Sequence, residues 1–472
     1  MTPQDFRKHA HELVDWMADY LENIEKYPVK SSVQPGEIID RLPEDAPVGG
    51  EPFAQIMADF ENIILPGMTH WQHPNFHAYF PANSSPPSLL AEMLTATLGA
   101  QCMIWQTSPA AAELEERMMQ WLIKMTGLPA NWHGVIQDTA STATLSSILT
   151  AREKFSDFAV NRRGFVDPQR FTVYCSEQTH SSIEKAVKIA GIGSEYLRQI
   201  PVDEAFAMRP DALEPAILRD RENGLIPLCV VATIGTTGST AIDPLPAIGE
   251  ICQKHNLWLH VDAAFAGTAL LLPEKRWMID GIAHADTFVF NPHKWMFTNF
   301  DCTAYFVKDK TTLIRTFEIL PEYLKTAEGS RVNNYRDWGI PLGRRFRALK
   351  LWFVIRSYGM QGLREKIAAH IALAQQFAGW IRESNDFELL APVPLNLICF
   401  HFKPKDFKDV ETVNRLNERL LTKINATGKI YLTHTKLNGI FTLRMVIGQT
   451  NVTLRHVENA WKLIQQAAKT LR

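Results

Sequence analysis

Residues 257–267 read L-W-L-H-V-D-A-A-F-A-G, and residues 288–295 read F-V-F-N-P-H-K-W. Each stretch contains a short apolar run that is typical of a buried parallel strand. One polar group follows each run, Asp262 in the first stretch and Lys294 in the second. Because ligands bind at the carboxyl ends of the strands in open α/β sheets, we expect both side chains at one ligand site.

A single carboxylate and a single amine at neighbouring strand ends suit pyridoxal 5'-phosphate (PLP). The lysine would form a Schiff base with the cofactor's aldehyde, and the aspartate would keep the pyridine nitrogen protonated so that the ring can accept electrons. The small residues Ala263, Ala264 and Gly267 leave room for a flat ring. For either residue alone, a structural ion pair or a solvated strand end is the alternative.

These stretches resemble the group II pyridoxal-phosphate decarboxylases, in particular the aromatic-L-amino-acid decarboxylase family. The strings H-V-D-A-A-F-A-G and N-P-H-K-W carry the resemblance, which extends over essentially the whole chain. It implies an α/β, aspartate-aminotransferase-like fold (PLP fold type I) with a mainly parallel central sheet flanked by helices. The expected domains are an N-terminal helical arm over 1–85 that dimerises, a large PLP-binding domain over 86–358 and a small α+β C-terminal domain over 359–472.

The composition excludes several other classes of protein. A chain of 472 residues with 46% hydrophobic and 21% charged residues is typical of a globular protein with two or three domains. The formal net charge of −2 gives no reason to expect a nucleic-acid partner. No run approaches the ~18 apolar residues of a membrane helix, so we expect no membrane partner. Six scattered cysteines and an N-terminus without an apolar core predict a cytoplasmic protein.

Residues 134–149, G-V-I-Q-D-T-A-S-T-A-T-L-S-S-I-L, predict a short strand, a turn of small hydroxyl residues and a helix. The start of a helix leaves backbone N–H groups free to bind an anion, and the helix dipole favours it. Ala140 and Ser141 are therefore predicted to contact the cofactor phosphate. A simple Ser/Thr N-cap is the alternative.

His180 follows a predicted strand that ends near Cys175 and precedes a helix that begins near Ser182. A lone histidine is more often structural than catalytic. The resemblance implies instead that His180 stacks on the pyridine ring, holds the substrate or donates a proton. The predicted cofactor-binding set also contains Thr237, which aligns with a cofactor-contacting position of the family, and Ala264, Asn291 and His293 beside Asp262 and Lys294.

Residues 320–335 are polar and show no steady period, which is typical of a lid. The resemblance assigns the catalytic Tyr323 to this stretch, in its own or the neighbouring subunit's site. This tyrosine would hand a proton to the substrate carbon after CO₂ leaves, and relatives with Phe at this position oxidise the amine to an aldehyde. A surface aromatic residue is the alternative.

Residues 70–83, H-W-Q-H-P-N-F-H-A-Y-F-P-A-N, are rich in aromatic side chains. The resemblance implies that Trp71, Tyr79 and Phe80 line the pocket for an aromatic substrate, and ordinary core packing is the alternative. Ala82 stands where the animal members carry a hydroxyl residue that contacts a catechol, so a preference for dihydroxyphenylalanine is not implied. No metal is predicted for the three histidines, because Pro74 breaks the helix that would align them.

Two further positions bear on the substrate. Met103 falls where the family places an aromatic residue that reaches the neighbouring subunit's substrate, so a homodimer is expected. Gly343 falls where plant relatives carry Gly when they take indoles and Ser when they take phenols, and a missing side chain leaves volume for the larger ring. Arg444 either grips the substrate carboxylate or forms a structural ion pair, and the ion pair is favoured.

The predicted function is PLP-dependent decarboxylation of an aromatic L-amino acid (tryptophan, tyrosine, phenylalanine or a hydroxylated form) to the arylalkylamine. An aminotransferase would use Lys294 as the base at Cα. An aldehyde synthase would also oxidise the amine, and Tyr323 argues against it. A serine hydrolase would need a triad of Ser141, His180 and Asp262, but the G-x-S-x-G elbow is missing.

The remaining pattern predicts secondary structure. Helices are expected over 4–26, 53–64, 88–105 and 109–126, and the strand that follows Lys294 is expected at the edge of the sheet. After a stop signal at Gly359, we expect helix 361–385, strand 394–402, helix 409–424, strands 428–434 and 440–447, and helix 453–471.

Overall fold

The computed structural model describes residues 1–166, 169–319, 331–407 and 409–471. The chain groups into two compact units. Unit 1 comprises Met1–Pro81, Ile381–Glu388 and Phe400–Arg472, and unit 2 comprises Ala82–Trp380 and Leu389–Cys399. The three domain ranges expected from the sequence stay a prediction.

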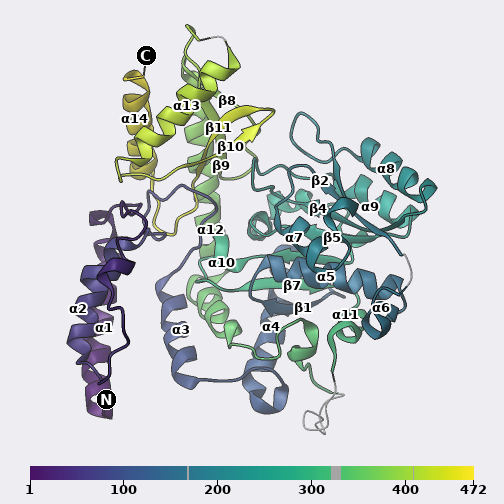
Figure 1. Ribbon diagram of the computed structural model, residues 1–472, viewed down its shortest axis with the longest axis horizontal. Coiled ribbons are helices and arrows are strands. Elements are labelled where there is room, and N and C mark those ends of the chain that lie inside the picture. Colours follow the sequence, from purple (N-terminus) through teal and green to yellow (C-terminus); the bar gives the residue numbers. More distant parts are fainter. Residues whose placement is uncertain (167–168, 320–330, 408, 472) are drawn as a thin grey trace. The chain divides into compact units, whose positions relative to one another are not determined.

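Unit 2 is built on a seven-stranded sheet in the order β1-β7-β6-β5-β4-β2-β3 (Figure 1). Strands β3, β2, β4, β5 and β6 pair in parallel, whereas β7 is antiparallel to both β1 and β6. The predicted α/β class with a mainly parallel sheet is confirmed. The strands are β1 (His133–Gln137), β2 (Phe171–Ser176), β3 (Leu197–Ile200), β4 (Ile226–Thr233), β5 (Trp258–Asp262), β6 (Thr287–Phe290) and β7 (Thr303–Val307).

Helices cover both faces of this sheet. Successive side chains of β2 point to opposite faces, and each contacts a helix there. Val173 belongs to a buried cluster with Ile148 of α5 and Val187 of α7. Its neighbour Tyr174 points to the other face, where its hydroxyl donates to Asp220 of α8 at 2.7 Å. Since both faces are covered, the strands read as continuous apolar runs. These helices are α5 (Ala140–Phe155), α7 (Ser182–Ile189), α8 (Pro210–Glu222) and α9 (Leu245–Lys254).

The strand after Lys294 does not lie at the edge of the sheet, so that prediction is wrong. β7 lies between β1 and β6, with Thr303 opposite Gln137 and Ala304 opposite Phe290. All five of its residues are buried, as expected for a strand paired on both sides. Because β7 runs antiparallel, its first residue lies beside the carboxyl ends of β1 and β6.

The helix predicted over 88–105 is shorter than expected. α3 (Pro86–Leu98) ends at Gly99, whose φ of +56° is the left-handed conformation that favours glycine at a helix end. Met103 therefore lies in a non-helical segment between α3 and α4 (Pro109–Thr126). α12 (Arg347–Glu383) is kinked at Gly359, where the backbone leaves the helical conformation, as the sequence predicted.

A second sheet has the order β10-β11-β9-β8. The strand predicted over 428–434 begins later, at Thr433, because Tyr431 forms an isolated bridge with Phe76 instead. β8 was not predicted. The elements of this region are β8 (Phe387–Leu389), β9 (Leu397–Phe402), α13 (Val410–Asn425), β10 (Thr433–Leu437), β11 (Ile440–Val446) and α14 (Leu454–Lys469).

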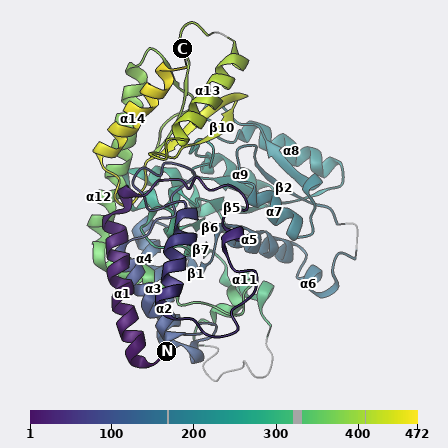
Figure 2. The ribbon, with the colours of Figure 1, turned by 60° about the vertical axis from the view of Figure 1, so that its left-hand side comes forward.

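The N-terminal helices of unit 1, α1 (Pro3–Glu22) and α2 (Phe53–Asp59), lie side by side (Figures 1 and 2). The indole of Trp16 packs edge-on against Phe60 at 5.3 Å and donates to Glu61 at 2.7 Å. Every residue of α1 is described and none is buried in the single chain, and Phe6 is 59% exposed. Within the described residues, no helix has the length and hydropathy needed to cross a membrane.

Candidate active site

Asp262 and Lys294 follow neighbouring strands of the sheet. Asp262 is the last residue of β5, opposite Val289 of β6, and Lys294 lies in α10 (Pro292–Trp295) just after β6. The Oδ1 of the buried Asp262 accepts from the N–H of Ala264 at 3.0 Å. The carbonyl of Ala264 accepts from the N–H of Asn291 at 2.9 Å. The turn after Asp262 is therefore tied to the turn before Lys294.

The charges at this edge affect one another. Burial lowers the pKa of the Lys294 amine, and the carboxylate of Asp262 acts in the opposite direction. Desolvation also lowers the pKa of His180, followed by the charge of Lys294, while Asp262 raises it. Together with the positions of these residues at the carboxyl ends of β5, β6 and β2, this agrees with one shared site. A depressed pKa leaves more of Lys294 as the neutral amine, which is the form that attacks an aldehyde.

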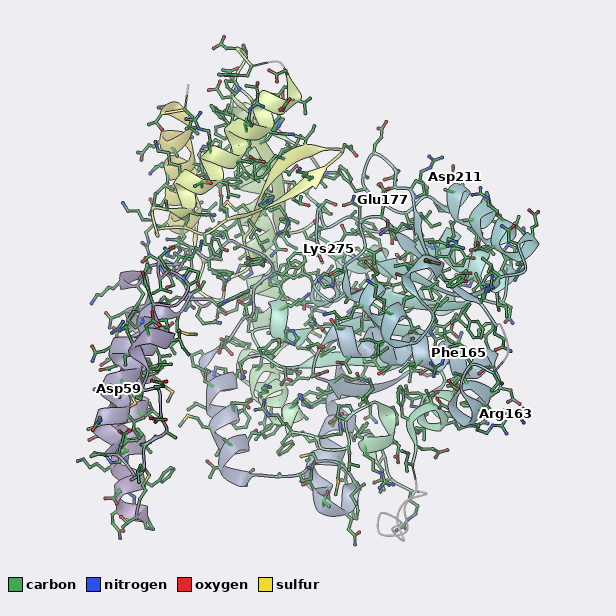
Figure 3. The ribbon with its side chains drawn as sticks, in the orientation of Figure 1. Asp59, Arg163, Phe165, Glu177, Asp211 and Lys275 are labelled. Atoms are coloured by element: carbon green, nitrogen blue, oxygen red, sulfur yellow. The ribbon has the colours of Figure 1, made fainter. Side chains whose placement is uncertain are left out.

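His180 lies in the loop between β2 and α7; Figure 3 labels Glu177, the first residue of that loop. Its Nδ1 lies 3.2 Å from the backbone N of Ser182 and 2.8 Å from the Ser182 hydroxyl. A backbone N–H only donates, so Nδ1 accepts and the neutral ring carries its proton on Nε2. Nε2 is therefore the ring atom with a proton to donate.

The first turn of α5 follows β1. Thr139 is the N-cap, and its hydroxyl oxygen accepts from the N–H of Thr142 at 3.3 Å. The N–H groups of Ala140 and Ser141 have no intrahelical partner, and no described residue accepts from either. Ser141 is exposed. The N-cap and the anion site are thus compatible, because the cap engages only Thr142.

Thr303 was not predicted, and it joins this helix start to the lysine turn. Its hydroxyl lies 3.0 Å from the carbonyl oxygen of Asp138 and 2.9 Å from Oδ1 of Asn291. Asp138 precedes the N-cap of α5, and Asn291 precedes α10. Only the pairing of β7 between β1 and β6 brings these residues together, so no local sequence pattern could have identified Thr303.

The other predicted cofactor residues lie in the connecting turns. His293 is buried, its Nδ1 accepts from the N–H of Cys302 at 3.0 Å, and its ring packs edge-on against Phe300 at 4.7 Å. Burial, and then the charge of Lys294, lower the pKa of His293 to about 3, so the ring is neutral. Thr237 is half-buried in the loop after β4. Their predicted cofactor contacts stay a prediction.

Three of the predicted substrate residues belong to unit 1. The rings of Trp71 and Tyr79 stack at 5.8 Å, and the Tyr79 hydroxyl lies 3.3 Å from that of Tyr431. The guanidinium of Arg444 lies 5.6 Å from the ring of the buried Phe80. It also donates to the Thr433 hydroxyl at 3.0 Å. The aromatic cluster exists, and its role as a pocket wall stays a prediction.

The other substrate residues belong to unit 2. Ala82 is half-buried, and Met103 and Gly343 lie in segments that are hydrogen-bonded to each other, because the carbonyl of Arg344 accepts from the N–H of Cys102 at 2.9 Å. Tyr323 lies outside the described residues.

The three histidines of residues 70–77 each have a partner of their own. The Nδ1 of His70 lies 2.7 Å from the Tyr20 hydroxyl, and that of His77 donates to the carbonyl of Val446 at 2.9 Å. The Nδ1 of His73 accepts from the N–H of Asn75 at 3.0 Å. Across the described ranges, no group of three or more His, Cys, Asp or Glu side chains is arranged to hold a metal ion.

This donor set fits PLP. It offers an amine of depressed pKa, a buried carboxylate on the adjacent strand and a helix start with two unused N–H groups. Gly267, which was expected to leave room for the ring, is also needed for packing. A Cβ at this position would lie 2.4 Å from the Cβ of Phe290. In the described part of the chain, no hydrogen bond joins Ser141, His180 and Asp262 into a hydrolase triad.

A model of the pyridoxal-dependent decarboxylase conserved domain matches residues 35–403. The chain belongs to the pyridoxal-dependent decarboxylases. This decarboxylase is 43% identical to tyrosine decarboxylase 4 of Petroselinum crispum, over 100% of the chain and 94% of the relative. It is also 43% identical to a phenylacetaldehyde synthase of Arabidopsis thaliana, over 100% of the chain and 97% of the relative.

Solved structures agree with this assignment of the decarboxylase. The tryptophan decarboxylase of Catharanthus roseus in complex with L-tryptophan is 39% identical, with a TM-score of 0.94, over 100% of this chain and 99% of that one. The Oryza sativa TDC with PLP and tryptamine is 35% identical, with a TM-score of 0.96 and the same coverage. Both the predicted fold type and the predicted cofactor of the decarboxylase are confirmed.

Proposed function

We propose that this decarboxylase removes CO₂ from aromatic L-amino acids (tryptophan, tyrosine, phenylalanine or hydroxylated forms) and releases the arylalkylamine. The observation that carries the proposal is that Asp262 ends β5, Lys294 follows the adjacent strand β6 and His180 lies in the loop after β2. Relatives named tyrosine decarboxylase and tryptophan decarboxylase support the substrate class.

In this proposal each residue has a separate task toward the cofactor. Lys294 holds the aldehyde carbon, Asp262 keeps a proton on the pyridine nitrogen, and the first turn of α5 binds the phosphate through Ala140 and Ser141. When bound, PLP supplies an electron sink for the negative charge that CO₂ leaves on the substrate Cα. Because Asp262 is buried, its interaction with the ring nitrogen is only weakly screened by water.

Proton delivery decides the product. Nε2 of His180 carries the ring proton, and we assign it a hydrogen bond to the substrate carboxylate or a proton held beside Cα. Tyr323 is proposed to deliver the proton to Cα. A tyrosine in this role favours decarboxylation over the aldehyde synthase activity named for the Arabidopsis thaliana relative.

We further propose that the enzyme acts as a homodimer in the cytoplasm. The exposed apolar side chains of α1, such as Phe6, support a second subunit covering the arm. All six cysteines are described and none forms a disulfide, which suits a reducing compartment.

The test is incubation of the PLP-loaded enzyme with a panel of aromatic amino acids while CO₂ and hydrogen peroxide are followed. We expect CO₂ and one arylalkylamine per turnover, without peroxide. Stoichiometric peroxide and aldehyde would favour the aldehyde synthase, and amino exchange with an added 2-oxoacid would favour an aminotransferase. Lys294→Ala should abolish the visible absorbance of the bound cofactor.

A further inference from the structure

Gln101 lies against Gly343, although the two residues are far apart in the sequence. The Oε1 of Gln101 accepts from the N–H of Arg344 at 2.7 Å. Since a backbone N–H only donates, the amide oxygen must face it and the NH₂ group must face away. A Cβ built on Gly343 would lie 3.2 Å from Nε2 of Gln101, the single described atom within 4 Å of it apart from adjacent residues.

The backbone itself does not require glycine at this position. Gly343 is not among the glycines with positive φ, so a residue with a side chain can adopt its conformation. The Gln101 amide, rather than the backbone, occupies the direction in which a side chain at position 343 would extend. The expectation that Gly343 leaves open volume for a larger ring is therefore incomplete.

A buried ion pair holds this turn in place. The guanidinium of Arg344 donates to Oε1 of Glu115 at 2.7 Å and to the carbonyl of Ile136 at 2.6 Å. Both side chains of the pair are buried. Glu115 also accepts from the N–H of Ile136 at 2.8 Å, so the turn is fixed to β1. Gln101 thus lies on a rigid support, which a specificity contact needs.

We propose that Gln101 is a specificity-determining residue whose NH₂ group fills the space beside Gly343 and donates a hydrogen bond to a ring hydroxyl of the substrate. This inference rests on the proposed function and on the expectation, from the family resemblance, that Gly343 lies beside the substrate. Gln101 is exposed, and no described residue accepts from its Nε2, so the donor is available to a ligand. A phenolic oxygen accepts such a bond, whereas an unsubstituted phenyl ring leaves the amide without a partner.

The test compares L-tyrosine with L-phenylalanine, which differ only in the ring hydroxyl. Gln101→Met keeps the length of the side chain and removes the donor. We expect kcat/KM for tyrosine to fall about ten-fold and that for phenylalanine to change less than about two-fold. Tyramine and phenethylamine are inhibitors that are not turned over, and they differ in the same hydroxyl. In Gln101→Met the inhibition constant of tyramine should rise about ten-fold and that of phenethylamine less than about two-fold. An equal change for both substrates would overturn the inference, because a merely structural role affects both alike.

A matched control is Gln361→Met, since the exposed Gln361 on α12 donates to Glu365 at 2.8 Å and to no other described residue. It should leave both substrates unchanged. All variants are first compared for cofactor absorbance and melting temperature, and Gln101→Leu replaces Gln101→Met if the latter does not fold.

Gly343→Val separates this inference from the proposed function. A valine there must displace the Gln101 amide, so it should lower the tyrosine-to-phenylalanine ratio as Gln101→Met does. If Gly343→Val leaves turnover of every aromatic amino acid unchanged, the proposed position of Gly343 is wrong. If Gly343→Val changes the ratio and Gln101→Met does not, only the role of Gln101 is wrong.

Discussion

Asp262 and Asp286 are carboxylates at opposite ends of the same pair of strands. Asp262 ends β5 and accepts from the N–H of Ala264. Asp286 precedes β6, and its Oδ2 accepts from the N–H of Leu259 at 2.9 Å. The two residues make similar local bonds, but only Asp262 lies at the edge where Lys294 and His180 meet. Substituting each of them in turn therefore distinguishes a role in the reaction from a role in folding.

We expect Asp262→Asn to lower kcat by about 10²–10³-fold, because the amide keeps the bond to Ala264 but loses the charge that holds a proton on the ring nitrogen. Kinetics with saturating PLP, together with a titration of cofactor absorbance, measure this effect. Asp286→Asn should lower the melting temperature at most and leave kcat near the wild-type value. Equal losses in the two variants would contradict the assigned role of Asp262.

Among the site residues, the sequence predicted those that a pattern of neighbouring residues identifies. Asp262 and Lys294 could be found because Asp262 directly follows an apolar run and Lys294 follows one after a short polar turn. Gln101 and Thr303 could not, because their partners are set by the tertiary fold: Gln101 bonds to a residue 243 positions away, and Thr303 to one 165 positions away. No periodicity encodes such pairings.

The position of strand β7 in the sheet could not be predicted from the sequence either. Its apolar run correctly predicted a strand, but its neighbours in the sheet depend on strand order, which the run does not contain. The left-handed Gly99 ended α3 earlier than the hydrophobic period suggested. The βαβ succession from β2 to β6 was predictable, because each strand alternates with a helix or a compact connection and parallel pairing follows.

Close packing of the 3-10 segment Ala266–Leu271 on β6 gives a second prediction. Gly267→Ala places a Cβ 2.4 Å from that of Phe290, so the segment must move and carry the Asp262 turn with it. We expect a loss of about 1–3 kcal/mol in unfolding free energy and weaker PLP binding.

The control is Gly379→Ala, in helix α12, where an added Cβ meets nothing within 4 Å. It should stabilise the protein by about 0.5–1 kcal/mol, since alanine favours the helix. Denaturant unfolding and cofactor titration measure both variants. Unchanged PLP affinity in Gly267→Ala would show that the segment does not position the site.

The exposed arm leads to a prediction for the assembly. Phe6 and Leu13 lie seven residues apart on one face of α1, and both are exposed in the single chain. If a second subunit covers them, Phe6→Glu with Leu13→Glu should shift the protein from dimer to monomer in analytical ultracentrifugation. Arg7→Glu, on another face of the same helix, is the control and should stay dimeric. A wild-type monomer would refute the proposed homodimer.

Buried histidines make the whole molecule sensitive to acid. Burial lowers the pKa of His77 and His260 to about 4 from an ordinary value of 6.5. Between these pH values the unfolded chain binds more protons than the folded one at these two positions. The contribution of His77 and His260 to the unfolding free energy therefore falls as the pH falls, and it is constant above about pH 6.5. Each such histidine adds a slope of up to about 1.4 kcal/mol per pH unit.

His260→Gln should therefore flatten the decline of the melting temperature between pH 6.5 and 4.5, whatever its effect at neutral pH. The exposed His11 provides the control, and His11→Gln should keep the wild-type slope. Identical slopes in all three proteins would show that His260 does not stay neutral in the folded state.

The insertion of β7 between β1 and β6 has a geometric consequence. Strands β1 and β6, which lead into the start of α5 and into the lysine turn, are two hydrogen-bonded strand spacings apart, about 10 Å in total. The sheet thus sets the spacing of the two strands that carry the proposed anchorages of the cofactor. If Ala140 and Ser141 bind the phosphate as proposed, a vitamer that lacks the phosphate would reach only one of the two anchorages, and we expect it to bind more weakly than PLP.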